Sequence, residues 1–376
     1  MPERSIWELV PFEFWTVAAF VFGCVVGSFL NVCIHRLPRG ESIVRPPSHC
    51  PHCGYAIPWG LNIPLVTWLW LGGRCANCQA RISARYFLVE LLTGTAFAAC
   101  WIKFADVSGH ISPALPLVYW LMISGMIAAT FIDIEHLIIP DAFTFGGMVA
   151  GLFCSFLVPA IHFKFPEFTR LTFHGAGLRD SFIGMAVGAA LIYAVVRLGK
   201  VFFGRQKLRL PPATRVFFTE TCVKLPAEEI AYEDLFYRKS DAIELQAQRV
   251  ELIDRCYASA AVRLSADRLE IGGDTFDPEK ILWLEGATDQ IILPREAMGP
   301  GDVTFMAAIG AFLGWPAVLF CFMISCLLGS MVGCALIILD KKDWSSRIPY
   351  GPYIAVAAVI WIFGGYKWLP LIWPLR

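Results

Sequence analysis

Long apolar runs separated by polar segments dominate this chain. A helix rises about 1.5 Å per residue, so roughly 20 apolar residues cross a hydrocarbon core about 30 Å thick. The run at residues 303–314 is shorter than that, because Trp315-Pro316 interrupts it. The pattern predicts about eight transmembrane helices, at residues 12–35, 86–104, 114–132, 139–162, 181–203, 303–314, 317–339 and 352–374.

The composition agrees with a membrane protein. Hydrophobic residues make up 57% of the chain and charged residues 16%, whereas charged residues make up about 25% of a soluble domain. We therefore predict an all-α polytopic membrane protein with a cytoplasmic four-cysteine zinc loop and a small soluble cytoplasmic insertion. The expected parts of the chain are residues 1–35, 36–85, 86–203, 204–298 and 299–376.

The distribution of Lys and Arg predicts the orientation, because cytoplasmic loops carry an excess of these residues. The loops assigned to one side are residues 36–85, 133–138, 204–302 and 340–351. The first of them holds Arg36, Arg39, Arg45, Arg74, Arg81 and Arg85. This side is predicted to be cytoplasmic, with the N-terminus outside. The apolar runs make the lipid bilayer an expected partner. The formal net charge is zero, so we expect no nucleic acid as a partner.

Residues 204–298 form a soluble insertion between two predicted spans. Polar and apolar residues alternate in Ala242–Ile253 and Ala261–Ile271, and Gly272-Gly273-Asp274 is typical of a turn. This pattern predicts a small β-containing domain. It contains no glycine loop for nucleotides and no metal-ligand spacing, so we interpret it as a regulatory or docking domain.

Four cysteines in the first cytoplasmic loop have the spacing of a metal site. Cys50 and Cys53 form one CxxC pair, and Cys75 and Cys78 form a second. Two such pairs place four thiolates around one zinc ion at about 2.3 Å each. Two disulfides or idle thiols are the alternative, which a reducing cytosol disfavours. Four sulfur ligands leave no open coordination position, so we predict a structural zinc ion.

Two aspartates lie at the cytoplasmic ends of predicted spans. Asp302 follows Gly299-Pro300-Gly301 and opens a short apolar helix, while Asp133 follows the apolar run that begins at Ala114. Acids at this depth are costly unless they are paired, hydrated or protonated. We therefore expect Asp133 and Asp302 to meet in one partly dry cleft. Such a pair shares one proton and hydrolyses peptides, the chemistry of an aspartic protease.

The neighbouring residues support this interpretation or receive structural roles. Gly299 and Gly301 permit close backbone approach around Asp302. Asp141 precedes a span and is a natural N-cap, whereas Glu135 and His136 are interpreted as polar turn residues. Two further roles are predicted for the first two spans. The first is an ion pair between Arg36 and Glu90, which is favoured over a role of these residues in methyl transfer. The second is a small-residue helix contact at Gly27, Ser28 and Asn31.

Taken together, these motifs resemble the type IV prepilin peptidases, membrane aspartic proteases with a GxGD motif. The resemblance covers nearly the whole chain. The matching residues are Gly27-Ser28-Phe29-Leu30-Asn31-Val32, Arg36, Pro38, both CxxC pairs, Arg85-Tyr86, Glu90, Ile132-Asp133, Ile139-Pro140-Asp141, Gly299-Pro300-Gly301-Asp302 and Ile348-Pro349-Tyr350-Gly351-Pro352.

The resemblance implies a bacterial inner-membrane enzyme that removes the leader of prepilins or pseudopilins at the cytoplasmic membrane face. It implies that Asp133 and Asp302 are catalytic and that the four cysteines bind zinc. Bifunctional members also methylate the new N-terminus with S-adenosylmethionine, but no motif for this cofactor is readable. Two features depart from the family pattern. Thr304 stands where Lys is common, and the insertion before Gly299 is longer than usual.

Two other functions fit part of the pattern. One is a presenilin-like protease that cuts within transmembrane helices of other substrates. The other is a non-enzymatic, zinc-stabilised membrane assembly subunit. The position of the cut distinguishes the first from a leader peptidase, and tolerance of changes at both aspartates would indicate the second.

Overall fold

The structure is a computed structural model of the chain. It describes residues 9–107, 110–111, 113–162, 173–226, 229–232, 235–236, 241–252, 254–278, 283–294, 299–339 and 348–368. Residues 340–347 of the fourth predicted cytoplasmic loop lie outside this set. The chain divides into two compact units, one formed by Met1–Tyr193 with Pro300–Arg376 and the other by Ala194–Gly299.

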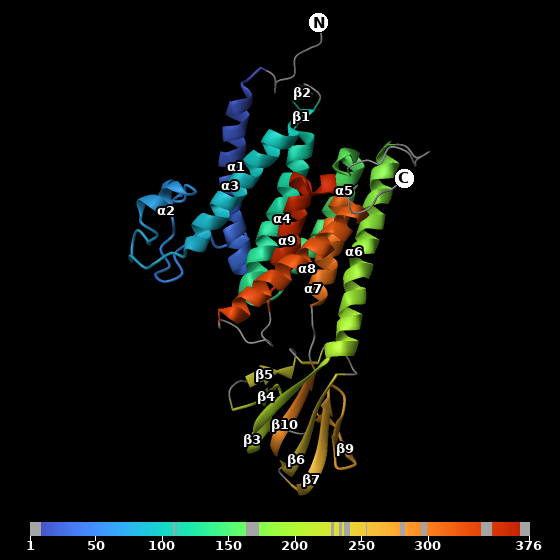
Figure 1. Cartoon of the computed structure of the whole chain (residues 1–376). Helices are drawn as coiled ribbons and strands as arrows, with labels where there is room; N and C mark the ends of the chain where they lie inside the picture. Colours follow the sequence, from blue (N-terminus) through green and yellow to red (C-terminus); the bar gives the residue numbers. More distant parts are fainter. Residues whose placement is uncertain are drawn as a thin grey trace. The chain divides into compact units, whose positions relative to one another are not determined.

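The first unit is helical (Figure 1). Short 3-10 turns follow or join its helices at Leu37–Arg39, Trp59–Leu61, Pro159–Ile161 and Gly365–Trp368, and a two-stranded hairpin pairs β1 (Asp106–Val107) with β2 (His110–Ile111). The helices are α1 (Phe12–Arg36), α2 (Val66–Trp70), α3 (Ala84–Phe104), α4 (Ala114–His136), α5 (Asp141–Leu157), α6 (Phe173–Phe203, within this unit as far as Tyr193), α7 (Pro300–Leu313), α8 (Trp315–Ile338) and α9 (Gly351–Phe363).

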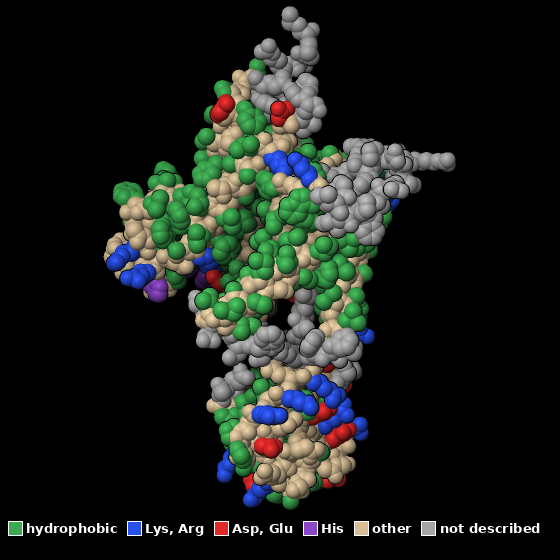
Figure 2. All heavy atoms as spheres, in the orientation of Figure 1, with side chains coloured by type: hydrophobic (Ala, Val, Ile, Leu, Met, Phe, Trp, Pro, Cys, Tyr) green, Lys and Arg blue, Asp and Glu red, His purple; other side chains and the backbone are tan. Residues whose placement is uncertain are grey.

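Five of these helices, α1, α3, α4, α6 and α8, are long and apolar enough to cross a membrane. Hydrophobic side chains cover much of the helical unit's visible face (Figure 2). On the helices that are long enough to cross a membrane, many of these side chains are exposed, as Val21 and Leu121 are. The chain is therefore a polytopic membrane protein. Helices α5, α7 and α9 have only 17, 14 and 13 residues, so each is shorter than a hydrocarbon core about 30 Å thick.

Two predicted spans differ more than the others from the helices in the structure. Helix α6 begins at Phe173, eight residues before the predicted start at 181. Helix α9 ends at Phe363 because Gly364 has a φ of 153°, a backbone conformation that is open to glycine and ends the helix. The predicted span 352–374 is thus too long as a single helix, and its residues 369–374 lie outside the described ones.

Helices α1 and α3 pack closely through small residues, as predicted. A β-carbon added to Gly27 would lie 2.7 Å from the Cα atom of Glu90, so only glycine allows the two backbones to come this near. Asn31 then donates from Nδ2 to the backbone carbonyl of Tyr86 at 3.0 Å. The predicted contact between the first two spans at Gly27 and Asn31 is confirmed.

The second unit contains an eight-stranded sheet, so the chain as a whole is not all-α and that part of the prediction is wrong. Its neighbouring strands are all antiparallel, in the order β5-β4-β3-β10-β6-β7-β8-β9. The strands are β3 (Arg205–Phe218), β4 (Cys222–Lys224), β5 (Glu229–Ala231), β6 (Ala242–Leu252), β7 (Cys256–Ser265), β8 (Leu269–Ile271), β9 (Asp274–Phe276) and β10 (Leu284–Pro294).

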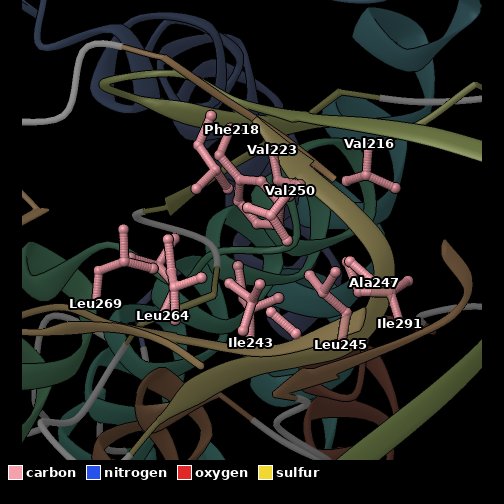
Figure 3. Packing of buried hydrophobic residues seen from close by; sticks show 14 of the residues in the cluster. Val216, Phe218, Val223, Ile243, Leu245, Ala247, Val250, Leu264, Leu269 and Ile291 are labelled. Carbon is pink, nitrogen blue, oxygen red and sulfur yellow. The ribbon is translucent and has the colours of Figure 1, made fainter. Parts of the chain in front are cut away.

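Alternation along these strands builds one apolar core. In β6 the side chains of Ile243, Leu245 and Ala247 are buried, while the residues between them are more exposed. They pack against residues of β3 and β10 such as Val216 and Ile291 (Figure 3). The predicted turn is confirmed, because Gly272 and Gly273 join β8 to β9 with φ values of 58° and 107°.

Candidate active site and metal centre

Asp302 is buried in the first turn of α7. Pro300 is the first helical residue, a position where its missing N–H group is not needed. The Asp302 residue, two positions later, is 8% exposed, and the positive end of the helix dipole favours its carboxylate. Thr304 donates its hydroxyl hydrogen to the carbonyl of Gly301 at 3.0 Å. It thereby closes this turn without adding the charge that a lysine would bring.

Asp133 lies in the last turns of α4 and is 5% exposed. The helix continues to His136, so the predicted end at residue 132 is too early. A carboxylate near a helix C-terminus is unfavourable, and the compensation comes from α9. The backbone N–H of Gly351, the first residue of α9, donates to Oδ2 of Asp133 at 2.8 Å.

Gly351 was not singled out as a functional residue by the sequence, although it lies inside the Ile348–Pro352 motif. Pro352 occupies the first turn of α9, where its missing N–H group costs nothing. The motif therefore starts a helix whose N-terminal end faces a buried carboxylate. This role of the motif is recognised only through the contact between residues that lie 218 positions apart.

The segments that carry the two aspartates meet around Ile139. A β-carbon on Gly301 would lie 3.3 Å from Cβ of Ile139, and one on Gly351 would lie 3.2 Å from its Cδ1. We call the meeting point of the α4 end, Ile139 and the first turns of α7 and α9 the aspartate junction.

Substituting Gly351 by alanine is expected to reduce the peptide cleavage predicted from the sequence about a hundredfold, because small displacements of a reacting group, here the predicted catalytic Asp133, have effects of this size. The added β-carbon would lie 2.7 Å from Oδ2 of Asp133, so the carboxyl group must move. Gly329→Ala on α8 is the matched control, since its β-carbon would be at an ordinary 3.4 Å from the Tyr353 ring. Initial rates of cleavage in detergent measure both variants. Equal activity of the two would contradict the role of Gly351.

Nearby polar residues have structural roles that differ in part from those predicted. Asp141 is the first residue of α5 and makes no capping hydrogen bond, because Pro140 occupies the N-cap position. The predicted N-cap is therefore wrong. Glu135 is exposed at the end of α4, where it forms an ion pair with Arg85 at the start of α3.

The four predicted metal ligands form one cluster. The ligand atoms of Cys50, Cys53, Cys75 and Cys78 all lie within 4.8 Å of one another. The Cys50 and Cys78 sulfurs are 3.8 Å apart, and tetrahedral ligands about 2.3 Å from a zinc ion are separated by about 3.8 Å. The set fits a shared metal ion.

Both CxxC segments fold in the same way. Cys50 donates its backbone N–H to the carbonyl of Tyr55 at 2.9 Å, and Cys75 donates to Ala80 at the same distance. The residue after each pair has a positive φ, 70° at Gly54 and 58° at Gln79. Each loop thus turns sharply and directs two sulfurs to the same point.

The electrostatics of the cluster favour a cation. The backbone N–H groups of Cys78 and Asn77 lower the pKa of the Cys75 thiol to about 7. The N–H of Ala80 acts to lower the pKa of Cys78, but burial and hydrogen bonds with the other three thiols raise it to about 11. Four thiolates in one cluster repel one another, so a positive ion that balances their charge stabilises the set.

The predicted ion pair between Arg36 and Glu90 is wrong. The Arg36 guanidinium donates to the carbonyls of Ser42 and Pro46 at 3.0 and 2.8 Å. Glu90 accepts the backbone N–H of Leu65 at 2.8 Å. Both side chains therefore fix loop backbone that follows or precedes their helices, because unpaired backbone groups there are costly to bury.

Two family models match this chain. The model for the Bacterial Peptidase A24 N-terminal domain matches residues 21–104, and the model for the Type IV leader peptidase family matches residues 280–334. The first segment contains the cysteine cluster, and the second contains Gly299, Gly301 and Asp302. Asp133 lies outside both.

Several curated relatives are similar. The Prepilin leader peptidase/N-methyltransferase of Myxococcus xanthus is 41% identical over 194 residues, which is 52% of each chain. The protein of that name from Aeromonas hydrophila is 27% identical over 382 residues, 94% of this chain and 89% of the relative. The Type 4 prepilin-like proteins leader peptide-processing enzyme of Escherichia coli is 36% identical over 210 residues, 51% of this chain and 71% of the relative. No solved structure gave a significant match.

Proposed function

Because this chain belongs to the type IV leader peptidase family, we propose that it is a membrane aspartic endopeptidase of the bacterial inner membrane. Its substrates are type IV prepilins or pseudopilins, from which it removes the leader. It also methylates the new N-terminus, as the two-part names of the Myxococcus and Aeromonas relatives suggest. The observation that carries the peptidase activity is the burial of Asp133 and Asp302 in segments that meet at Ile139.

The proposed chemistry uses the two carboxyl groups as a unit that holds one proton. The ionised aspartate takes a proton from a water molecule, whose oxygen attacks the scissile carbonyl carbon. The protonated aspartate donates a hydrogen bond to the carbonyl oxygen. When the C–N bond breaks, the leaving nitrogen receives a proton from the pair. Gly299 and Gly301 leave room for the substrate backbone beside Asp302.

We propose that all eight predicted spans are embedded in the bilayer, the shorter α5, α7 and α9 included, with the aspartate junction facing the cytoplasm. The arginines of the first loop support this orientation. In this orientation residues 36–85 and 204–298 also lie in the cytoplasm.

We propose that the ion held by the four cysteines is zinc, which four thiolates select. With no open coordination position its role is structural, because it folds the loop at residues 50–78. For the methylation, S-adenosylmethionine supplies a methyl group carried on a sulfonium sulfur.

An apolar groove beside the aspartate junction is suited to the apolar helix that follows a prepilin leader. Its volume is about 540 Å³, and it lies between α1, α4, α5 and α7. Phe305, one turn after Asp302, lines it. Ala142, Gly146 and Ala150 also line it at four-residue spacing on α5, and a β-carbon on Gly146 would meet nothing within 4 Å. Small residues at this spacing let another helix approach closely.

Gly146→Trp is expected to raise the KM for a full-length prepilin about tenfold, the effect of losing roughly 1.4 kcal/mol of binding. The indole would fill the groove that the substrate helix occupies. Val149→Trp is the matched control, because Val149 is on the same helix and is 68% exposed. Steady-state kinetics in nanodiscs measure both variants. A KM that rises equally in both, or in neither, would contradict docking in this groove.

Mass spectrometry of one prepilin after incubation with the purified protein and S-adenosylmethionine tests the function as a whole. The expected product has lost its leader at the cytoplasmic edge of its apolar segment and has gained one methyl group. A cut within the apolar segment would indicate the presenilin-like alternative. An unchanged prepilin would favour the non-enzymatic subunit.

A further inference from the structure

The loop between α1 and α3 exposes an apolar surface on its short helix α2. Leu69 and Trp70 lie three and four positions after Val66, so the three side chains share one side of this helix. They are 61%, 77% and 57% exposed, whereas Thr67 is buried. Ile63, three positions before Val66, is exposed as well. We call Ile63, Val66, Leu69 and Trp70 the α2 face. Exposed apolar residues that are grouped in this way mark an interaction surface.

Helix α2 lies beside α3 rather than beyond its end. The backbone N–H of Leu65, just before α2, donates to Oε2 of Glu90 at 2.8 Å. Glu90 comes six positions after Ala84, the first residue of α3, so this contact is about 9 Å along the helix at about 1.5 Å per residue. The rings of Trp68 and Phe87 have centroids 5.1 Å apart. The loop therefore packs on the first two turns of a helix that is long and apolar enough to cross a membrane.

Lipid reaches this same level of α3. Leu88 and Leu92, two positions before and after Glu90, are exposed on the candidate membrane span, and exposed leucines of a spanning helix face lipid chains. Segments that lie in a membrane surface bury their apolar side about 5–10 Å into the boundary between headgroups and acyl chains. The contact of Leu65 with Glu90 is at a similar distance from the start of α3. The α2 face thus lies at a depth where the bilayer surrounds the protein.

Basic residues of the loop lie nearer the start of α3. The backbone N–H of Ile82, two positions before α3, donates to the carbonyl of Gly73 at 2.7 Å. Arg74 and Arg81 lie directly inside this pair, are exposed, and form no ion pair with any residue that the structure describes. Hydrophobic side chains gather over the part of the unit that Figure 1 labels α2, and Lys and Arg side chains lie at its lower edge (Figure 2). An apolar face with a basic edge is typical of segments that lie in a membrane surface.

We propose that the α2 face is inserted into the bilayer from the cytoplasmic side and that phospholipid covers it. The indole of Trp70 lies at the level of the headgroups, where tryptophan is enriched in membrane proteins. Arg74 and Arg81 extend to the lipid phosphates. The loop that carries the four cysteines is thereby held to the membrane surface between its two helices. Only the choice of leaflet rests on the proposed orientation, because the insertion itself requires only that α1 and α3 cross the membrane.

Photolabelling of the unmodified, full-length protein tests the insertion without any variant. The protein is placed in nanodiscs of phosphatidylethanolamine and phosphatidylglycerol that include a phospholipid with a diazirine on its acyl chain, and mass spectrometry locates the adducts. Adducts are expected in residues 63–70, with a yield comparable to that at Leu88 and Leu92. Val44 is the internal control, because it is 77% exposed but lies in the segment that Arg36 holds at the end of α1. It is expected to stay unlabelled. Labelling of α3 without labelling of residues 63–70 would overturn the proposal.

A variant that combines Leu69→Ser with Trp70→Ser is expected to lower the labelling of residues 63–70 about tenfold, because interfacial binding scales with the buried apolar area. Val44→Ser is the matched control and is expected to leave this labelling unchanged. Plasma mass spectrometry is expected to find the wild-type metal content in both variants, which shows that the loop is still folded. Undiminished labelling in the double variant would contradict the insertion.

A protein partner is the competing occupant of this surface. Protection of residues 63–70 from the lipid label in the unmodified protein, together with cross-links from these residues to a second chain in the same nanodisc, would show that another copy covers the α2 face and would overturn the proposal. None of these measurements uses prepilin cleavage. The insertion of the loop and the proposed peptidase activity can therefore fail separately.

Discussion

Asp133→Asn and Asp302→Asn are each expected to reduce prepilin cleavage about a thousandfold, within the range of general acid–base catalysis. Asparagine has the shape of aspartate but can neither take a proton from water nor share one with its partner. Because the pair acts as a unit, the double variant is expected to be hardly less active than either single variant. Initial rates with a purified prepilin in lipid nanodiscs measure the effect.

Asp141→Asn is the matched control for these two variants. Asp141 lies at the same end of the helices, but it is exposed and makes no capping hydrogen bond. Its substitution is expected to leave the rate within about twofold, since surface changes have small effects. Substantial cleavage by either Asp133→Asn or Asp302→Asn would contradict a shared catalytic role. A control as inactive as these variants would indicate a general requirement for acids in this region.

Cys50→Ser is expected to remove the bound metal ion and to unfold the loop around residues 50–78. A structural zinc ion contributes an apparent binding free energy of about 10–16 kcal/mol, far more than so small a loop gains from its own core. The buried Cys50 sulfur is one of four ligands within 4.8 Å of one another, and three remaining thiols do not close the tetrahedron. Plasma mass spectrometry is expected to find about one metal ion per wild-type chain and far less in the variant.

Cys256→Ser controls for the loss of a thiol elsewhere, because Cys256 is an exposed residue of β7. It is expected to keep the metal. Hydrogen exchange locates the effect, with faster exchange expected in residues 50–78 of Cys50→Ser. Wild-type metal content in Cys50→Ser would show that the four cysteines do not share an ion.

Local patterns allowed several features to be predicted from sequence. The long apolar runs placed α1, α3, α4 and α8 to within a few residues, because a lipid-facing helix needs only length and apolarity. The CxxC spacing identified the cysteine cluster, since ligands three residues apart converge through one turn of backbone. Asp302 was placed at a helix start because it follows Gly299-Pro300-Gly301 and precedes an apolar run. The catalytic pairing of Asp133 with Asp302 stays a prediction.

Only the tertiary structure decided which distant groups meet. The Gly351 N–H reaches Asp133 across 218 positions, and Arg36 and Glu90 each bind backbone groups of the intervening loop instead of each other. Hydropathy indicates whether each segment prefers lipid or water. The spacing of residues indicates which side chains a single turn of backbone brings close together. Neither hydropathy nor spacing determines how α9 packs against α4 or where the loop between α1 and α3 lies on these two helices. Those contacts depend on the free energy of the whole packed unit, because most buried hydrogen-bonding groups must find partners at the same time.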